Sequence, residues 1–306
     1  MSDAELVRAR IRFWGVRGTC PSPGAHTVRY GGHTSCVEVR TANGELIVLD
    51  AGTGMRALGQ SIESEIDSRP AHVFLSHRHG DHVFGMSQFA PTIAGIRDIV
   101  LACGNVSVSE LRSFVSALLS PPLFPPVNGL ARRLSFLDWD VVEGVQIGTD
   151  CRVRGLPARH PGEATVIVVE DELGKLLAYA PDNELGTVGT DASVTAWRDA
   201  LATALREVPI LIHDATYTDS EIAAHAGWGH SSAEEATRFA VACNAGALLL
   251  FHHHPDRSDD EITQLVMHCR ELAQSLSSPL RVDAAAEGLT LEIRLRESQM
   301  ESAFVN

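Results

Sequence analysis

The chain has 306 residues, of which 44% are hydrophobic and 21% charged, a composition typical of a globular protein with a buried core. Its net charge of −14 disfavours extended nucleic acid as a partner, although a small anionic substrate held by metal ions is compatible with it. No apolar run approaches the ~20 residues of a membrane-spanning helix, and residues 1–10 lack the apolar core of a secretory signal. With no linker or repeat visible, we expect a single cytoplasmic domain over residues 1–306 that makes no membrane contact.

Hydrophobic periodicity predicts alternating strands and helices. In the first half of the chain we expect a hairpin of strands 36–40 and 46–49 around Asn43-Gly44, a helix through Met55, Leu58, Ile62 and Ile66, strands at 71–75 and 99–102, and a helix through Leu111, Phe114, Val115 and Leu118. In the second half we expect strands at 145–156, 165–170, 176–180, 209–213, 247–251 and 289–295, and a helix through Val194, Trp197, Leu201 and Leu205. Ser232-x-x-Glu235 and Ser258-x-x-Glu261 are capping boxes that each predict the start of a further helix. This order fits two packed β-sheets with helices outside.

A cluster of histidines follows the strand at 71–75 directly. The segment His77-Arg78-His79-Gly80-Asp81-His82 brings three imidazoles and a carboxylate into one short loop. Such groups are costly to bury without partners, and they are ligands for zinc, manganese or iron. Four ligands in one loop cannot enclose two metals, so we expect others from elsewhere. The candidates that follow other predicted strands are His160, Asp182 and His252, and the sequence leaves open whether His252 or His253 is the last ligand.

These ordered motifs resemble those of the metallo-β-lactamase superfamily, and Asp50-Ala-Gly-Thr-Gly54 is similar to the aspartate–glycine motif that precedes the histidine cluster there. The resemblance extends from about Ile11 to Leu295. It implies an α/β fold, the four-layer αββα sandwich, and two divalent metal ions, zinc first and manganese or iron as alternatives. It also implies the following roles: His77, His79 and His160 on one metal, Asp81, His82 and His252 on the other, Asp182 as the bridge, and Asp50 as a residue that orients the histidine loop.

A second pair of motifs bears on the reaction. His213-Asp214-Ala-Thr-Tyr217 and His230-Ser-Ser-Ala233 are similar to paired motifs of the ribonuclease Z and cyclic-nucleotide phosphodiesterase branch. In that branch a carboxylate orients a histidine that protonates the leaving alkoxide, which implies Asp214 and His230 as a general-acid dyad. Relatives often carry glutamate where this chain has Asp214, one methylene shorter. The alternative is that His230 only lies in the loop that enters a helix.

We therefore expect a metal-dependent hydrolase, a phosphoric diester hydrolase that acts on a small phosphodiester such as a cyclic nucleotide. Two metals about 3.5–4 Å apart can share a bridging hydroxide that attacks phosphorus, with Asp81 placed to orient it. The alternatives are a tRNA 3′-processing endoribonuclease, which the acidic charge and the lack of a long basic insertion disfavour, a lactonase or β-lactamase-type hydrolase on the same metals, and a metal-bound sensor.

Some expectations concern partners and residues around the site. A homodimer is expected by analogy only. Arg17, Arg29 and Arg159 are either contacts for a substrate phosphate or ordinary surface arginines. The glycines of segments 13–18 and 30–36 either form turns between strands or permit a close approach of the backbone.

Overall fold

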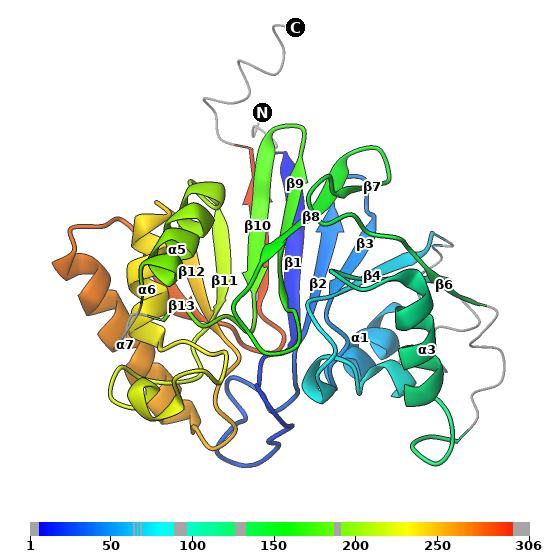
Figure 1. Ribbon diagram of the computed structural model, residues 1–306, viewed down its shortest axis with the longest axis horizontal. Helices are drawn as coiled ribbons and strands as arrows, with labels where there is room; N and C mark the ends of the chain where they lie inside the picture. Colours follow the sequence, from blue (N-terminus) through cyan, green and yellow to red (C-terminus); the bar gives the residue numbers. More distant parts are fainter. Residues whose placement is uncertain are drawn as a thin grey trace, which may run out of the picture.

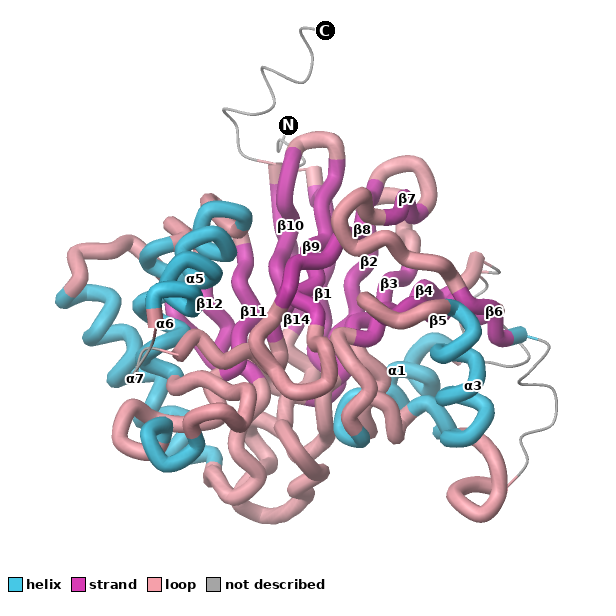
Figure 2. The backbone as a smooth tube through the Cα atoms, viewed as in Figure 1, coloured by secondary structure: helices cyan, strands magenta, loops and turns pink. Residues whose placement is uncertain are grey.

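The computed structural model describes residues 6–63, 65, 67, 69–88, 97–125, 133–186 and 191–295. In this part of the chain two mixed β-sheets of seven strands each lie side by side in the middle of the molecule, and helices cover the outer face of each sheet (Figure 1). The smooth backbone trace of Figure 2 shows the same four layers, with the strands inside and the helices outside. The αββα sandwich expected from the sequence is confirmed.

The first sheet has the spatial order β14 (Thr290–Arg294), β1 (Val7–Gly15), β2 (Cys36–Thr41), β3 (Leu46–Leu49), β4 (Ala71–Leu75), β5 (Ile99–Cys103) and β6 (Leu134–Phe136). The second has the order β13 (Arg281–Ala284), β12 (Ala247–Phe251), β11 (Ile210–Asp214), β10 (Gly174–Ala180), β9 (Thr165–Asp171), β8 (Cys151–Pro157) and β7 (Val145–Ile147). The helices are α1 (Met55–Ile62) and α3 (Val108–Leu118) on the first sheet, α5 (Ala192–Ala204), α6 (Ala233–Ala242) and α7 (Asp259–Ser275) on the second, and the short 3-10 helices η1 (Gly80–His82) and η2 (Ile222–His225).

Apolar side chains fill all three spaces between the layers. Phe13 and Ile47 of the first sheet belong to the same buried cluster as Tyr179 and Phe251 of the second. Separate clusters join α1 and α3 to the outer face of the first sheet and α5, α6 and α7 to that of the second. Burial of this apolar area is the main force that holds the layers together. Among the described residues, no helix is both long and apolar enough to cross a bilayer.

Most elements lie where the sequence predicts them. Both capping boxes form, because the Ser232 and Ser258 hydroxyls accept hydrogen bonds from the backbone N–H three residues later. Ile66, expected on the helix that became α1, lies outside the described residues. Strand β1 was not expected, although arginines alternate along it with buried Ala9, Ile11 and Phe13. Strands β6 and β13 were missed because they are short and, unlike the four-residue strand β3, carry no continuous apolar run.

The direction of the strands determines where a site can form. Strands β10, β11 and β12 pair in parallel, as do β3, β4 and β5. Their carboxyl ends therefore emerge at one edge of the sandwich, the lower edge in Figure 1. The loops that leave these strands carry the predicted histidines and aspartates, which is the usual arrangement for sites built at strand ends.

Candidate metal centre

Four of the predicted ligands converge from three loops. His77 and His79 follow β4, His160 follows β8 and Asp182 follows β10. One donor atom from each lies within 4.8 Å of the others. His79 Nδ1 lies 3.1 Å from His160 Nε2, and Asp182 Oδ2 lies 3.5 Å from His160 Nε2 and 3.7 Å from His77 Nε2. Three imidazole nitrogens and one carboxylate oxygen directed at one point form a donor set suited to a divalent metal.

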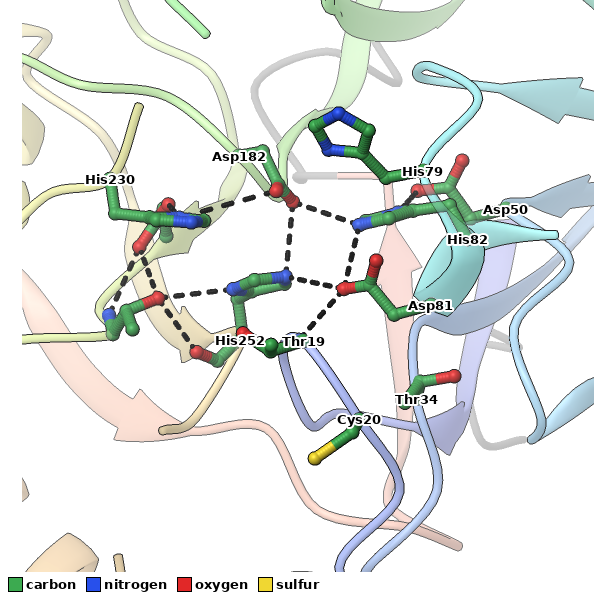
Figure 3. Close-up of polar contacts among 12 residues, drawn as sticks. Thr19, Cys20, Thr34, Asp50, His79, Asp81, His82, Asp182, His230 and His252 are labelled. Carbon is green, nitrogen blue, oxygen red and sulfur yellow. Dashed lines mark hydrogen bonds and ion pairs between the residues drawn. The ribbon is translucent and has the colours of Figure 1, made fainter. Parts of the chain in front are cut away.

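A second group lies on the other side of Asp182. Asp81 Oδ2 lies 3.3 Å from His82 Nε2 and 3.1 Å from His252 Nε2 (Figure 3). The second oxygen of Asp182, Oδ1, lies 3.0 Å from His82 Nε2 and 3.2 Å from His252 Nε2. Each oxygen of Asp182 therefore faces a different group of predicted ligands.

Several polar atoms of this centre are buried without a hydrogen bond. Among the described residues, His77 Nε2, His82 Nε2 and Asp182 Oδ1 have no hydrogen-bond partner although water cannot reach them. Each such atom costs about 1–3 kcal/mol, more where it is charged. All three atoms face the two groups of donors, so divalent cations bound there would satisfy them, and the residues present fit metal ions.

The charge states of Asp182 and His77 suit metal binding, whereas His82 must release a proton to bind a metal. Burial lowers the pKa of His82, but the carboxylates of Asp81, Asp182 and Asp50 outweigh burial and raise this pKa well above the usual 6.5. Burial raises the pKa of Asp182, but the imidazoles of His252, His82 and His77 lower it by more, so this carboxylate stays ionised. Burial lowers the pKa of His77 well below its usual 6.5, which keeps its imidazole neutral. Ionised carboxylate and neutral imidazole are the forms that bind a metal.

Asp50 supports the histidine loop from behind. It directly follows β3 in the left-handed region, with φ at 61°, a strained conformation for a residue with a Cβ. Its Oδ2 accepts hydrogen bonds from His82 Nδ1 at 2.7 Å, Ser76 Oγ at 2.9 Å and the Tyr179 hydroxyl at 2.8 Å. The bond to His82 fixes that imidazole so that Nε2 is free for a ligand role, which is the orienting role expected of Asp50.

Asp214 connects His230 to the metal centre. His230 Nδ1 donates to Asp214 Oδ2 at 2.7 Å, so the shorter aspartate side chain does reach the histidine. The Thr216 hydroxyl lies 2.9 Å from Asp214 Oδ1 and 3.0 Å from His252 Nδ1. Thr216 was not singled out from the sequence, although it stands inside the segment that carries Asp214. One carboxylate thus orients His230 directly and His252 through a hydroxyl.

His230 is held in its protonated form. Burial lowers its pKa, but the adjacent Asp214 raises it by more, through charge and hydrogen bonding, to about 9. Its ring stacks on that of His252 with centroids 5.0 Å apart, and its Nδ1 lies 4.0 Å from Asp182 Oδ2. A protonated imidazole therefore stands beside the two groups of donors, where a general acid would be needed.

Two glycines allow the ligands to take these positions. A Cβ on Gly229 would lie 2.2 Å from His160 Nδ1, and the Gly229 carbonyl oxygen accepts a hydrogen bond from that nitrogen at 2.9 Å. A Cβ on Gly18 would lie 2.3 Å from His252 Nδ1. Gly18 belongs to the glycine segment 13–18, for which a close approach of the backbone was one expectation. At Gly18 the backbone does come close, and the group it approaches is the side chain of His252. Gly229 was missed, although it directly precedes His230.

The conformation of the chain at the end of β12 distinguishes His252 from His253 as the last predicted ligand. His252 has φ at 58° and directs Nε2 at Asp81 and Asp182. His253 is buried, and its Nε2 lies 2.9 Å from the carbonyl oxygen of Ala285, away from the centre. His252 is therefore the one whose ring faces the other ligands.

The arginines proposed as phosphate contacts are engaged elsewhere. Arg17 is fully buried, and its guanidinium donates to backbone carbonyl groups. Arg29 contacts Thr263 and Asp260, and Arg159 Nη1 donates to the carbonyl oxygen of Glu184. None of the three guanidinium groups contacts the predicted ligands, because neighbouring protein groups already hold each of them.

Comparison with known proteins identifies the family. The family model of the beta-lactamase superfamily domain matches residues 46–253, about two thirds of the chain and every predicted ligand. The chain belongs to the metallo-β-lactamase superfamily. Relatives named ribonuclease Z are similar over most of their length. That of Natronomonas pharaonis is 27% identical over 287 residues, covering 79% of this chain and 86% of the relative, and that of Myxococcus xanthus is 26% identical over 292 residues, covering 84% and 91%.

Solved structures show the same fold. The metallo-β-lactamase fold protein YhfI of Bacillus subtilis has a TM-score of 0.66 with 17% identity over 93% of this chain and 99% of that one. The short form of human tRNase Z has a TM-score of 0.61 with 21% identity over 94% and 100%. The family, these relatives and the His/Asp cluster indicate that this member of the superfamily is a metal-dependent hydrolase.

Proposed function

We propose that this metallo-β-lactamase-fold hydrolase is a dinuclear phosphodiesterase that acts on a small phosphodiester such as a cyclic nucleotide. The observation that carries the proposal is the Asp214–His230 pair beside the ligand cluster. Breaking a phosphodiester releases an alkoxide, which needs a proton as it departs, and a histidine held in its protonated form beside the reacting centre supplies one.

In this proposal His77, His79 and His160 hold one ion, Asp81, His82 and His252 hold another, and Asp182 serves both. The nitrogen-rich donor set favours zinc, with manganese or iron as alternatives. Bound there, the ions would supply an activated water nucleophile and charge stabilisation for phosphoryl transfer.

The residues of the chain divide the remaining work. Asp81 Oδ2 accepts a hydrogen bond from the Thr19 backbone N–H at 2.8 Å, which fixes the carboxylate that orients the attacking water. Asp214 holds the Nδ1–H of His230, which leaves the Nε2 proton for the departing oxygen. As the bond between phosphorus and that oxygen breaks, the proton moves from His230 Nε2 to the oxygen and His230 becomes neutral.

RNA is the second candidate substrate, because several relatives are named ribonuclease Z. These relatives weaken the expectation that extended nucleic acid is an unlikely partner. Against RNA stand the charge of the chain, 39 acidic and 25 basic residues, and the fact that Lys175 is its single lysine. Affinity for a phosphate backbone depends on such basic side chains, so we favour the small phosphodiester.

The test is a substrate panel with zinc- or manganese-loaded protein: a cyclic nucleotide, a tRNA precursor with a 3′ trailer, a simple lactone and a β-lactam. We expect turnover of the cyclic nucleotide, its loss in His79→Ala, and normal turnover in the matched variant Leu173→Ala at the far edge of the sandwich. Cleavage of the tRNA precursor alone would show that RNA, and not a small phosphodiester, is the substrate. Turnover of only the lactone or the lactam would overturn the phosphodiesterase proposal.

A further inference from the structure

An exposed tryptophan stands next to the proposed general acid. Trp228 lies two residues before His230 and has 60% of its surface exposed. Among the described residues, its indole Nε1 has no hydrogen-bond partner. A tryptophan offers a large, flat aromatic surface, and the exposed part of this ring is free to contact a ligand. The proposed chemistry of the centre gives Trp228 no role.

Trp228 is joined to His230 by a series of aromatic rings. The indole meets His225 edge to face with centroids 5.0 Å apart, and His225 stacks on Tyr217 at 4.1 Å with an interplanar angle of 12°. Tyr217 is buried and lies edge-on to His230 at 6.1 Å. The exposed ring is therefore the outer end of a packed series that begins at the general acid, and its place relative to the centre is set by packing.

The backbone on both sides of Trp228 is fixed as well. The buried Glu184 carboxylate accepts hydrogen bonds from Gly227 N at 3.0 Å and from Gly229 N at 2.9 Å. The carbonyl oxygen of Gly229 in turn accepts the hydrogen bond from His160 Nδ1. One carboxylate thus ties the tryptophan segment to a predicted metal ligand. A preorganised ring loses little freedom when a ligand stacks on it.

We infer that Trp228 stacks on a nucleobase of the substrate, on the side of the scissile bond that carries the leaving oxygen. This rests on the proposed phosphodiesterase function, because His230 marks the leaving side. A flat aromatic surface binds any base through its π-face. An acidic chain that gains little affinity from phosphate contacts needs such a source of binding energy.

The first experiment measures kcat and KM with metal-loaded protein on dinucleoside monophosphates. One substrate carries both bases, one lacks the base on the leaving side, and one lacks the other base. We expect Trp228→Ala to raise KM about 5- to 100-fold for substrates with the leaving-side base, with kcat within about threefold. It should not change KM when that base is absent. Trp228→Phe should keep most of the affinity, and Leu173→Ala, which also truncates an exposed apolar side chain, should behave as wild type.

The second experiment does not depend on turnover. Of the four tryptophans, Trp14 and Trp139 are buried and Trp197 is half-buried, so Trp228 is the most exposed reporter. AMP should quench the fluorescence, ribose 5-phosphate should not, and the AMP effect should vanish in Trp228→Ala but persist in Trp197→Phe. Quenching by AMP without hydrolysis of any phosphodiester would overturn the proposed function but support the stacking site. An equal rise in KM with and without the base, or a dimer that dissociates in Trp228→Ala while KM is unchanged, would overturn the stacking inference.

Discussion

Replacing Asp214 by asparagine tests the general acid most directly. In the wild type, the carboxylate accepts the Nδ1–H of His230 at 2.7 Å. An asparagine keeps the size of the side chain but loses the charge. Its oxygen can still accept from Thr216, whose N and Oγ1 both donate to Oδ1, which leaves the amide NH₂ facing His230. That group donates to Nδ1, so it favours the neutral imidazole, a much weaker acid than the imidazolium.

The structure gives the size of the effect. The rise in the pKa of His230 from 6.5 to about 9 corresponds to roughly 3 kcal/mol in favour of the protonated form. Without the Asp214 carboxylate, burial still lowers this pKa and only Asp182 and Asp81 remain to oppose it, so the pKa should fall. A smaller fraction of the variant therefore carries the proton at neutral pH. Since a positioned general acid contributes about 10²–10⁴-fold, we expect kcat to fall about 10²–10³-fold for a substrate with an alkoxide leaving group.

The assay is the pH profile of kcat for a cyclic nucleotide and for bis(p-nitrophenyl) phosphate. A general acid works only when protonated, so activity is lost as pH rises through the pKa of His230, and Asp214→Asn should move this loss to lower pH. Bound cations repel the imidazolium, so in the loaded wild type the loss should already lie below pH 9. The nitrophenolate leaving group needs no proton, so its hydrolysis should fall much less. An unchanged profile, or an equal fall for both substrates, would refute the role of His230 as the acid.

Three further predictions concern metal binding and its support. Gly229→Ala should lower the affinity for metal about 10- to 100-fold, because its Cβ would lie 2.2 Å from His160 Nδ1. Gly227→Ala, which has a similar positive φ and open space around its Cβ, should leave that affinity unchanged. Equal metal affinities of the two variants in a titration would contradict this. Tyr179→Phe removes a hydrogen bond to Asp50 and should cost about 1–2 kcal/mol in urea unfolding, and a variant as stable as wild type would show that this bond contributes nothing. Removing the metal with a chelator should lower the melting temperature, since metal at a thousandfold excess over its Kd stabilises by about 4 kcal/mol; a melting temperature independent of metal would argue against a site in the folded protein.

The features that local sequence controls were predicted well. The histidine loop after β4 is six residues long, so its ligands had to lie near one another in any fold. Strand β2 alternates apolar and charged residues, strands β3 and β4 are mostly apolar, and the capping boxes at Ser232 and Ser258 depend on residues three positions apart. These patterns determine which elements form, and the family resemblance supplied the order of the distant ligands.

What the sequence determined by itself was thus the type of most elements and the chemistry of the predicted metal ligands. Only the tertiary structure decided the contacts between distant residues. The left-handed turn at His252 directs that ring to the centre, while the carbonyl oxygen of Ala285 engages His253. The hydroxyl bridge at Thr216 and the space beside Gly229 depend on side chains far apart in the chain. No periodicity encodes such contacts, because they arise only when the layers pack and bring the ends of separate strands to one edge.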